Sequence, residues 1–170
     1  LPTINIDIFG EKVFAKEADG KLFPSTYFLL PSHKEEDIVR MMTETFEKKY
    51  TSTFRWTVIP EPLTKRDEVI SLASIVEGEA KSEEDMKIVA GILLTRLKKK
   101  MPLQVDVAKE TYTSRGLPSV PINNPGLTAL GAVLHPTASP YLFYITGNDG
   151  AMYYAKTFEE HKRNIKKYLK

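Results

Sequence analysis

The most continuous pattern of buried positions runs from Thr64 to Ala80. Thr64 can cap a helix, and Asp67 can return the hydrogen bond as in a capping box. Apolar residues then fill more than half of the helix circumference, namely Val69, Ile70, Leu72, Ala73, Ile75 and Val76. A narrow polar or small strip remains at Ser71, Ser74 and Gly78. The pattern predicts a helix that is buried on most sides.

A second helix is predicted to begin after Ser82, where three acidic residues in the first turn suit the helix dipole. Its apolar face contains Met86, Val89, Ala90, Leu93, Leu94 and Leu97. Gly91 allows another element to approach closely. The two helices should form a hairpin with its turn near residues 78–82, which holds Glu77 and Glu79 at the rim of the core.

The first part of the chain mixes strand and helix patterns. Alternation predicts a strand over residues 3–8 and a second one over 12–15, before a turn at Asp19 and Gly20. Ser32 and Glu35 resemble a capping box for a helix that reaches about Lys48. Residues 54–59 resemble a strand, and the prolines of 60–62 should end it.

The last part begins with a long, polar and proline-rich stretch, residues 101–126, which is typical of a binding loop. A short helix is predicted over 127–134, and a β-hairpin over 141–145 and 152–155. Thr157 and Glu160 should cap a final helix. Together these elements predict an α+β fold in which short strands flank a helical hairpin and a helix ends the chain.

Composition and charge exclude several classes of partner and site. The 170 residues fit one domain, and 24 basic against 22 acidic residues give a net charge of +2, which argues against nucleic acid as a partner. Without cysteine there is no disulfide, thiolate nucleophile or thiolate metal site. His33, His135 and His161 lack the spacing of paired ligands, so we expect no metal and no cofactor. The chain begins with Leu1 and has no apolar run long enough to cross a bilayer, which suggests a fragment without its N-terminal anchor.

Two carboxylates are the strongest candidates for chemistry. A carboxylic acid at the end of an apolar helix is poorly solvated and can stay protonated near neutral pH, as an acid catalyst must. Helical periodicity puts Glu77 and Glu79 near opposite edges of the apolar stripe and does not choose between them. A glutamate at a helix end is also often a solvated surface residue.

Seven motifs carry a resemblance to one family. In order they are residues 22–27 (LFPSTY), 72–79 (LASIVEGE), 89–91 (VAG) with 95–97 (TRL), 101–106 (MPLQVD), 116–118 (GLP), 121–126 (PINNPG) and 134–136 (LHP). This set resembles the endolytic murein transglycosylases, the YceG-like or MltG-type family of bacterial cell-wall synthesis. The resemblance implies a lysozyme-like helical hairpin that carries the catalytic glutamate. It also implies a lyase that cuts the β-1,4 bond between N-acetylmuramic acid and N-acetylglucosamine and leaves 1,6-anhydro-muramyl ends.

The resemblance also implies roles for single residues. The first glutamate of the family's Ser-Ile-Val-Glu-x-Glu motif is the catalytic acid, and Glu77 stands at that position. Gln104, Asp106, Tyr112 and Asn124 match polar positions that would bind the sugar or orient Glu77, or else fix their own loop. Glu79 would either be a supporting carboxylate that disfavours ionisation of Glu77 or be structural.

Two departures from the family concern the site. The family continues from Gln-x-Asp into a long variable insertion, whereas here Asp106 is followed almost directly by residues 110–112 (ETY). Gly78 and Ala80 replace the commoner Lys and Thr. The missing segment would wall the groove, so a non-catalytic glycan-binding or scaffold module is an alternative. A hydrolytic muramidase that uses Asp106 as its second carboxylate is another.

The family resemblance also sets expectations for the whole protein. We expect residues 1–170 to form a single YceG-like catalytic domain, without the N-terminal membrane helix and the LysM-like subdomain of the family. Peptidoglycan glycan strands would be the substrate, and cell-wall synthases would be partners. The full-length protein would be anchored in the cytoplasmic membrane by one helix, with this domain on the extracytoplasmic side.

Overall fold

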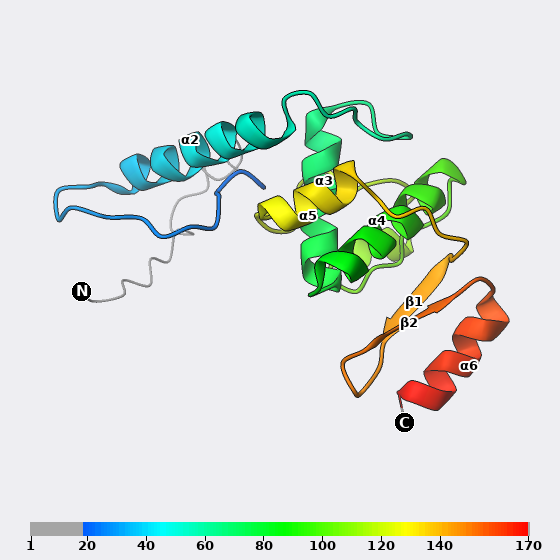
Figure 1. The fold of residues 1–170 in the computed structure, drawn as a ribbon. Coiled ribbons are helices and arrows are strands. Elements are labelled where there is room, and N and C mark those ends of the chain that lie inside the picture. The colour runs from blue at the N-terminus through cyan, green and yellow to red at the C-terminus, as the bar shows by residue number, and fades with distance from the viewer. Residues whose placement is uncertain (1–18, 170) are drawn as a thin grey trace.

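The architecture is built around one buried helix, α3 (Arg66–Glu79) (Figure 1). The computed structural model describes residues 19–169, so the strands expected at 3–8 and 12–15 lie outside the described residues. Eight consecutive residues of α3, from Val69 to Val76, are buried. Helices α4 (Glu83–Lys98) and α5 (Leu127–Leu134) pack against α3 and against each other. A helix enclosed in this way needs apolar residues on most of its sides, as its sequence predicts.

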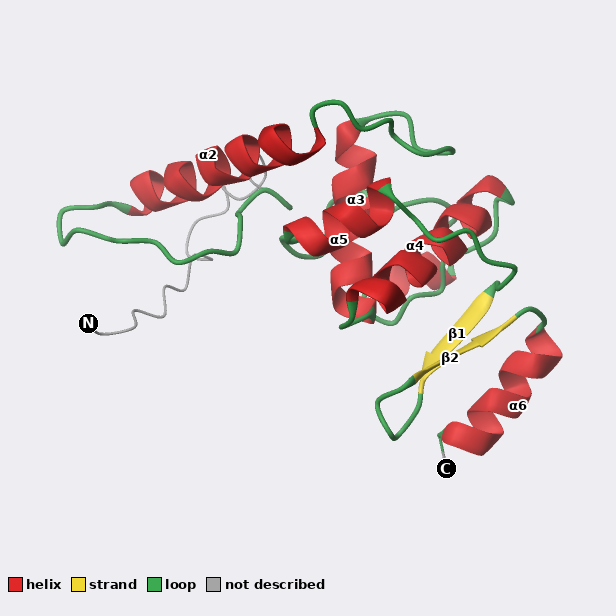
Figure 2. Cartoon of the chain, in the orientation of Figure 1, coloured by secondary structure: helices red, strands yellow, loops and turns green. Residues whose placement is uncertain are grey.

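The predicted helical hairpin is confirmed. A short turn after Glu79 connects α3 to α4, and the Ser82 hydroxyl caps α4 by accepting a hydrogen bond from the Asp85 N–H at 3.1 Å. The carbonyl oxygen of Thr137 lies where a side chain on Gly91 would stand, so glycine allows this close approach. Residues 19–169 contain five α-helices and one two-stranded antiparallel sheet, which confirms the α+β expectation (Figure 2).

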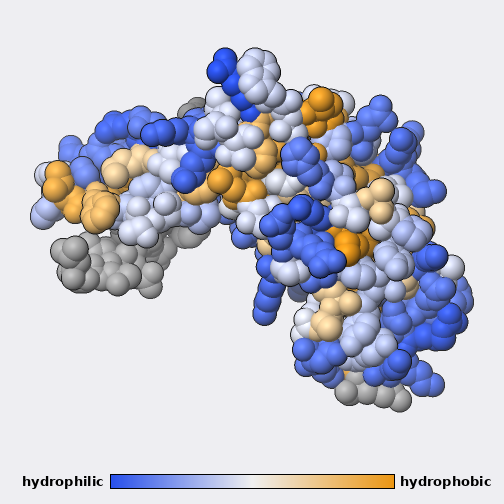
Figure 3. Space-filling model, viewed as in Figure 1, coloured by the Kyte–Doolittle hydropathy of each residue, from blue (hydrophilic) through white to orange (hydrophobic). Residues whose placement is uncertain are grey.

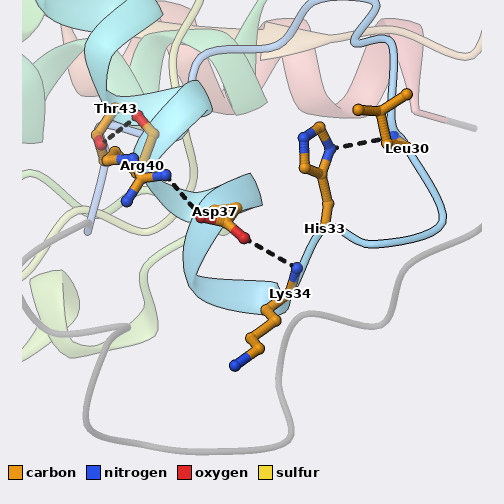
Figure 4. Close-up of polar contacts among 6 residues, drawn as sticks. All are labelled: Leu30, His33, Lys34, Asp37, Arg40 and Thr43. Atoms are coloured by element: carbon orange, nitrogen blue, oxygen red, sulfur yellow. Dashed lines mark hydrogen bonds and ion pairs between the residues drawn. The ribbon is translucent and has the colours of Figure 1, made fainter.

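Helix α2 (Glu35–Phe54) differs from its prediction at both ends. Its N-cap is Lys34 and not Ser32, because the Lys34 N–H donates to the Asp37 carboxylate at 3.1 Å, which Arg40 also contacts (Figure 4). The helix continues past Lys48 because aromatic rings one turn apart contact each other along it. Phe46 and Tyr50 stack with ring centroids 5.8 Å apart, and Tyr50 meets Phe54 edge-on with centroids 5.5 Å apart.

Two further predictions in this region are wrong. The stretch 54–59 is not a strand, because Phe54 ends α2 and Trp56 and Val58 are exposed without a strand partner in the described structure. Before α3 the N-cap is Lys65, and Glu68 rather than Asp67 accepts the bonds from Thr64, at 2.6 Å from the N–H and 3.0 Å from the hydroxyl. A strand needs a neighbour to satisfy its backbone, and residues 19–169 provide none for the stretch 54–59.

The long loop between α4 and α5 is fastened to the polar strip of α3. The Ser74 hydroxyl accepts a hydrogen bond from the Ile122 N–H at 3.0 Å, and the Ser71 hydroxyl donates to the Pro118 carbonyl at 3.4 Å. The loop's one regular element in the described chain is a 3-10 helix, η1 (Lys109–Tyr112). The strip of small polar residues thus marks where irregular backbone crosses the central helix.

The C-terminal elements form a separate layer beside α4. Strands β1 (Phe143–Thr146) and β2 (Met152–Ala155) pair antiparallel, and α6 (Phe158–Tyr168) packs on this hairpin (Figure 1). The capping box predicted at Thr157 and Glu160 is present. The visible surface of this layer is mostly hydrophilic (Figure 3). No helix within residues 19–169 has the length and hydropathy that a membrane span requires.

Candidate active site

Glu77 lies exposed at the end of α3, next to the start of α5. Its Oε2 accepts a hydrogen bond from the Gly126 N–H at 3.1 Å, and Gly126 is the N-cap of α5. The Gly126 N–H and the positive end of the α5 dipole thus both point toward the Glu77 carboxyl group. A Cβ on Gly126 would lie 3.8 Å from that oxygen and 3.9 Å from Pro24. The carboxylate is therefore held by one backbone group and remains open to a ligand.

Asn124 supports the same side of α3. Its Oδ1 accepts a hydrogen bond from the Leu22 N–H at 2.9 Å, which ties the N-terminal segment to the loop that leads into α5. The buried ring of Phe23 follows directly. Asn124 thus holds two chain segments together close to Glu77, and its predicted contact with sugar stays a prediction.

Glu79 has a different environment, although it is only two residues away. It is half-buried, its Oε2 accepts a hydrogen bond from the Tyr144 hydroxyl at 3.0 Å, and its buried Oε1 has no partner among the described residues. Burial raises the pKa of Glu79, and the negative charge of Asp106 adds to the increase. Burial and the neighbouring Glu79 carboxyl raise the pKa of Tyr144 well above its ordinary value.

The remaining predicted residues, Gln104, Asp106 and Tyr112, share one exposed loop. The Tyr112 hydroxyl donates to Asp106 Oδ1 at 2.6 Å, and this bond is the main reason why the pKa of Tyr112 is raised. The Gln104 N–H donates to the Thr111 carbonyl at 3.1 Å, so the two ends of the loop are joined. This loop lies on the Glu79 side of α3, where Asp106 acts electrostatically on Glu79 and Tyr144.

Two residues of this neighbourhood were not predicted, Arg96 and Tyr144. Arg96 is buried, and its guanidinium donates to the carbonyls of Leu142, at 2.7 Å, and Leu103. Burial lowers the pKa of Arg96. A sequence signal for Arg96 did exist, because an arginine on the apolar face of a helix needs buried partners. Tyr144 had no such signal, since tyrosine is common in half-buried strands.

A cavity of about 590 Å³ lies toward the other end of α3. Its lining includes Lys21, Asp67, Ile70, Ser71 and Pro121. None of the predicted site residues lines it. The open surface around Glu77, and not this cavity, is therefore the candidate active site.

Comparisons with known proteins agree on one family. The model of the YceG-like family matches residues 5–110 and 109–167. An endolytic murein transglycosylase of Bacillus subtilis is 29% identical over 190 residues, which cover 98% of this chain and 52% of the relative. An endolytic murein transglycosylase of Streptococcus pneumoniae is 30% identical over 179 residues, or 89% of this chain and 32% of the relative. The chain thus spans about half of one relative and a third of the other.

The loop after Asp106 is where the match to the family model breaks. The two matched segments meet at residues 109–110. The Bacillus match covers 190 residues and this chain has 170, so the relative has at least 20 residues in the matched region without a counterpart here. The break in the family-model match falls in the segment that the sequence predicts to be shortened.

A solved structure gives the same result at the level of the fold. The crystal structure of a YceG-like protein from Listeria monocytogenes superposes with a TM-score of 0.74 at 28% identity, covering 86% of this chain and 55% of that one. Together with the family model, which matches nearly the whole sequence, this shows that the chain belongs to the YceG-like family.

Proposed function

We propose that this chain is the catalytic domain of an endolytic peptidoglycan lytic transglycosylase. It cleaves the β-1,4 bond between N-acetylmuramic acid and N-acetylglucosamine within nascent glycan strands and leaves 1,6-anhydro-muramyl ends. Family membership and the names of the relatives support this proposal. The observation that carries it is the position of Glu77, an exposed carboxyl group at the end of a buried helix with one oxygen held by Gly126.

In this mechanism Glu77 acts twice. As an acid it donates its proton to the glycosidic oxygen while the oxocarbenium-like transition state develops. As a carboxylate it then accepts the proton of the muramyl 6-hydroxyl, which attacks the anomeric carbon of its own ring. Because this attack is intramolecular, neither water nor a nucleophilic carboxylate is needed. The Gly126 N–H binds Oε2 and leaves Oε1 available for the proton transfers.

The other exposed polar residues supply binding. Gln104, Asp106 and Tyr112 lie on the short loop beside the end of α3, where hydrogen bonds and ring stacking can hold sugars. Asn124 keeps the opposite side in place through Leu22. The short loop leaves this side of the site more open than a long insertion would.

We extend the proposal to the full-length protein. It is held in the cytoplasmic membrane by one helix, with this domain on the extracytoplasmic side and cell-wall synthases as partners. Family membership supports the anchor, and the substrate itself lies outside the cytoplasm. Protease added to spheroplasts that carry the full-length protein should degrade this domain, and a protected domain would contradict the proposed location.

Mass spectrometry of the products is the test of the function. Purified glycan strands are incubated with the 170-residue chain, with Glu77→Gln, and with Glu44→Gln as the control at an exposed position of α2. We expect 1,6-anhydro ends with the parent and the control, and none with Glu77→Gln. The amide keeps an oxygen for the Gly126 N–H, so the local fold is preserved. Reducing ends would instead indicate a muramidase, and intact strands in every reaction would indicate a binding or scaffold module.

A further inference from the structure

Gln104 has an unusual backbone conformation. Only two residues other than glycine have a positive φ in the described chain, Lys100 at 55° and Gln104 at 50°. Lys100 follows the end of α4, where a left-handed residue commonly terminates a helix. Gln104 lies in the middle of a loop and ends no helix. A left-handed conformation is unfavourable for a non-glycine residue, so contacts on both sides must maintain it.

Buried groups hold Gln104 from both directions. Before it, the Leu103 carbonyl accepts a hydrogen bond from Arg96 Nη1, and Leu103 itself is fully buried. After it, the Gln104 N–H donates to the Thr111 carbonyl at 3.1 Å and the Val105 N–H donates to the buried Thr111 hydroxyl at 3.1 Å. The Gln104 side chain is exposed, so the contacts that fix this residue are made by its own backbone N–H and by its neighbours.

Arg96 also connects this loop to the C-terminal hairpin. Its Nε donates to the Leu142 carbonyl at 2.7 Å, and its guanidinium carbon lies 5.2 Å from the centre of the Phe143 ring. Within the described residues, both hydrogen bonds of this buried cation therefore go to backbone carbonyls and none to a carboxylate. The two carbonyls belong to segments that flank the Glu79 side of α3, and Tyr144, which binds Glu79, follows Phe143 directly. A planar group with several fixed donors suits this bridging role better than lysine.

We propose that Arg96 is a positioning residue of the active site, which holds Gln104 in its left-handed conformation and so presents the loop of Gln104, Asp106 and Tyr112 to the glycan. The proposal rests on the proposed function, because it assigns that loop to substrate binding. Arg96 itself is buried and does not touch the substrate. Its effect reaches the glycan through the backbone at Leu103.

Kinetics of Arg96→Lys and Arg96→Met provide the first measurement. Lysine keeps the charge but cannot reproduce both directed bonds, and we expect KM for glycan strands to rise by about tenfold, or about 1.4 kcal/mol, with kcat within about twofold of the parent. Methionine should raise KM further. Arg66→Lys is the matched control, because Arg66 binds Glu47 with two bonds of 2.8 Å away from this loop. Its KM should equal that of the parent.

Gln104→Gly separates positioning from a general loss of stability. Glycine adopts a positive φ without strain, so this variant should melt at a higher temperature than the parent and yet bind glycan strands more weakly. In the Gln104→Gly background, Arg96→Lys should change KM by less than about twofold, because the residue through which it acts is gone. An equal KM increase in both backgrounds would overturn the proposal, as would an unchanged KM in folded Arg96→Lys.

Amide hydrogen exchange gives a readout that does not depend on activity. In Arg96→Lys the amides of Gln104 and Val105 should exchange faster, while those of Leu22 and Gly126 keep the parental rate. If the parent cleaves no glycan, the proposed function fails, and the exchange rates still decide whether Arg96 holds the loop. Unchanged exchange at Gln104 and Val105 would overturn the positioning role. If Arg96→Met does not fold, the lysine variant decides.

Discussion

Two carboxyl groups at the end of α3 have opposite surroundings. Glu77 is exposed and bound to the backbone N–H of Gly126, whereas Glu79 is half-buried and bound to the Tyr144 hydroxyl. Residues two positions apart on a helix point to nearly opposite sides. One side meets the start of α5 and the other meets the C-terminal hairpin.

The comparison teaches that burial alone does not identify the working acid. Burial raises the pKa of Glu79, and a search for perturbed groups would select it first. Its hydrogen bond, however, goes to the side chain of a strand and connects two elements of the fold. A glycan polymer must reach the catalytic acid, and of the two glutamates Glu77 is the one exposed to solvent. We infer that Glu79 supports the structure and Glu77 acts on the substrate.

The largest effect should separate the two glutamates by rate. Glu77→Gln should lower the rate of glycan cleavage by about 10²- to 10⁴-fold, the usual contribution of general acid–base catalysis. Glu79→Gln should lower it by less than about tenfold, because glutamine still accepts the Tyr144 bond. Initial rates on purified strands measure both. Equal losses in the two variants would contradict the division of roles.

The second effect concerns stability on the Glu79 side. Tyr144→Phe removes the donor to Glu79 Oε2 and leaves a half-buried carboxyl group without its hydrogen bond. We expect the free energy of unfolding to fall by about 1–3 kcal/mol in urea denaturation. Tyr141→Phe is the control, since its ring stacks on Tyr154 and its hydroxyl has no such partner in the described structure. A loss of equal size in both variants would show that the Glu79 contact adds nothing.

The third effect is a pH dependence with a definite sign. Because the pKa of Glu79 is raised above its ordinary value of 4.5, the folded state favours the protonated form. The resulting stabilisation is fully present below the ordinary value and is lost as the pH rises through the raised pKa. The glutamine of Glu79→Gln cannot titrate. Over this pH range its free energy of unfolding should therefore rise relative to that of the parent, by at most about 1.4 kcal/mol per pH unit. Parallel stability curves would contradict the prediction.

Much of the fold follows from local sequence rules. Helix α5 has the predicted bounds, and Ser82 and Thr157 cap their helices as expected, because each signal depends on residues close in sequence. The end of α2 was predicted too early, since only the structure reveals that the rings of Phe46, Tyr50 and Phe54 contact one another along the helix. The predicted strand at 54–59 failed for a related reason, because a strand requires a distant partner.

The candidate site also combines features that local sequence predicts with features that depend on tertiary contacts. Periodicity placed Glu77 and Glu79 at the rim of the core, and the structure finds both there with separate partners. Periodicity did not reveal which glutamate would be buried, because the burial depends on Tyr144, which lies 65 residues along the chain from Glu79. The burial of Arg96 had a local signal in the sequence, but the identity of its acceptors, Leu103 and Leu142, is set by tertiary contacts.

The smallest effect is expected at Gly78, which lies between Glu77 and Glu79 on α3. A Cβ on Gly78 would lie 3.0 Å from Cγ1 of Val107, which is tight, so the short loop rests directly on the helix. Alanine in a helix is favoured over glycine by up to about 1 kcal/mol, and in the parent this gain should be offset because Val107 must move. In a Val107→Ala background Gly78→Ala should raise the melting temperature by a few degrees. Equal effects of Gly78→Ala in both backgrounds would mean that the loop does not press on α3.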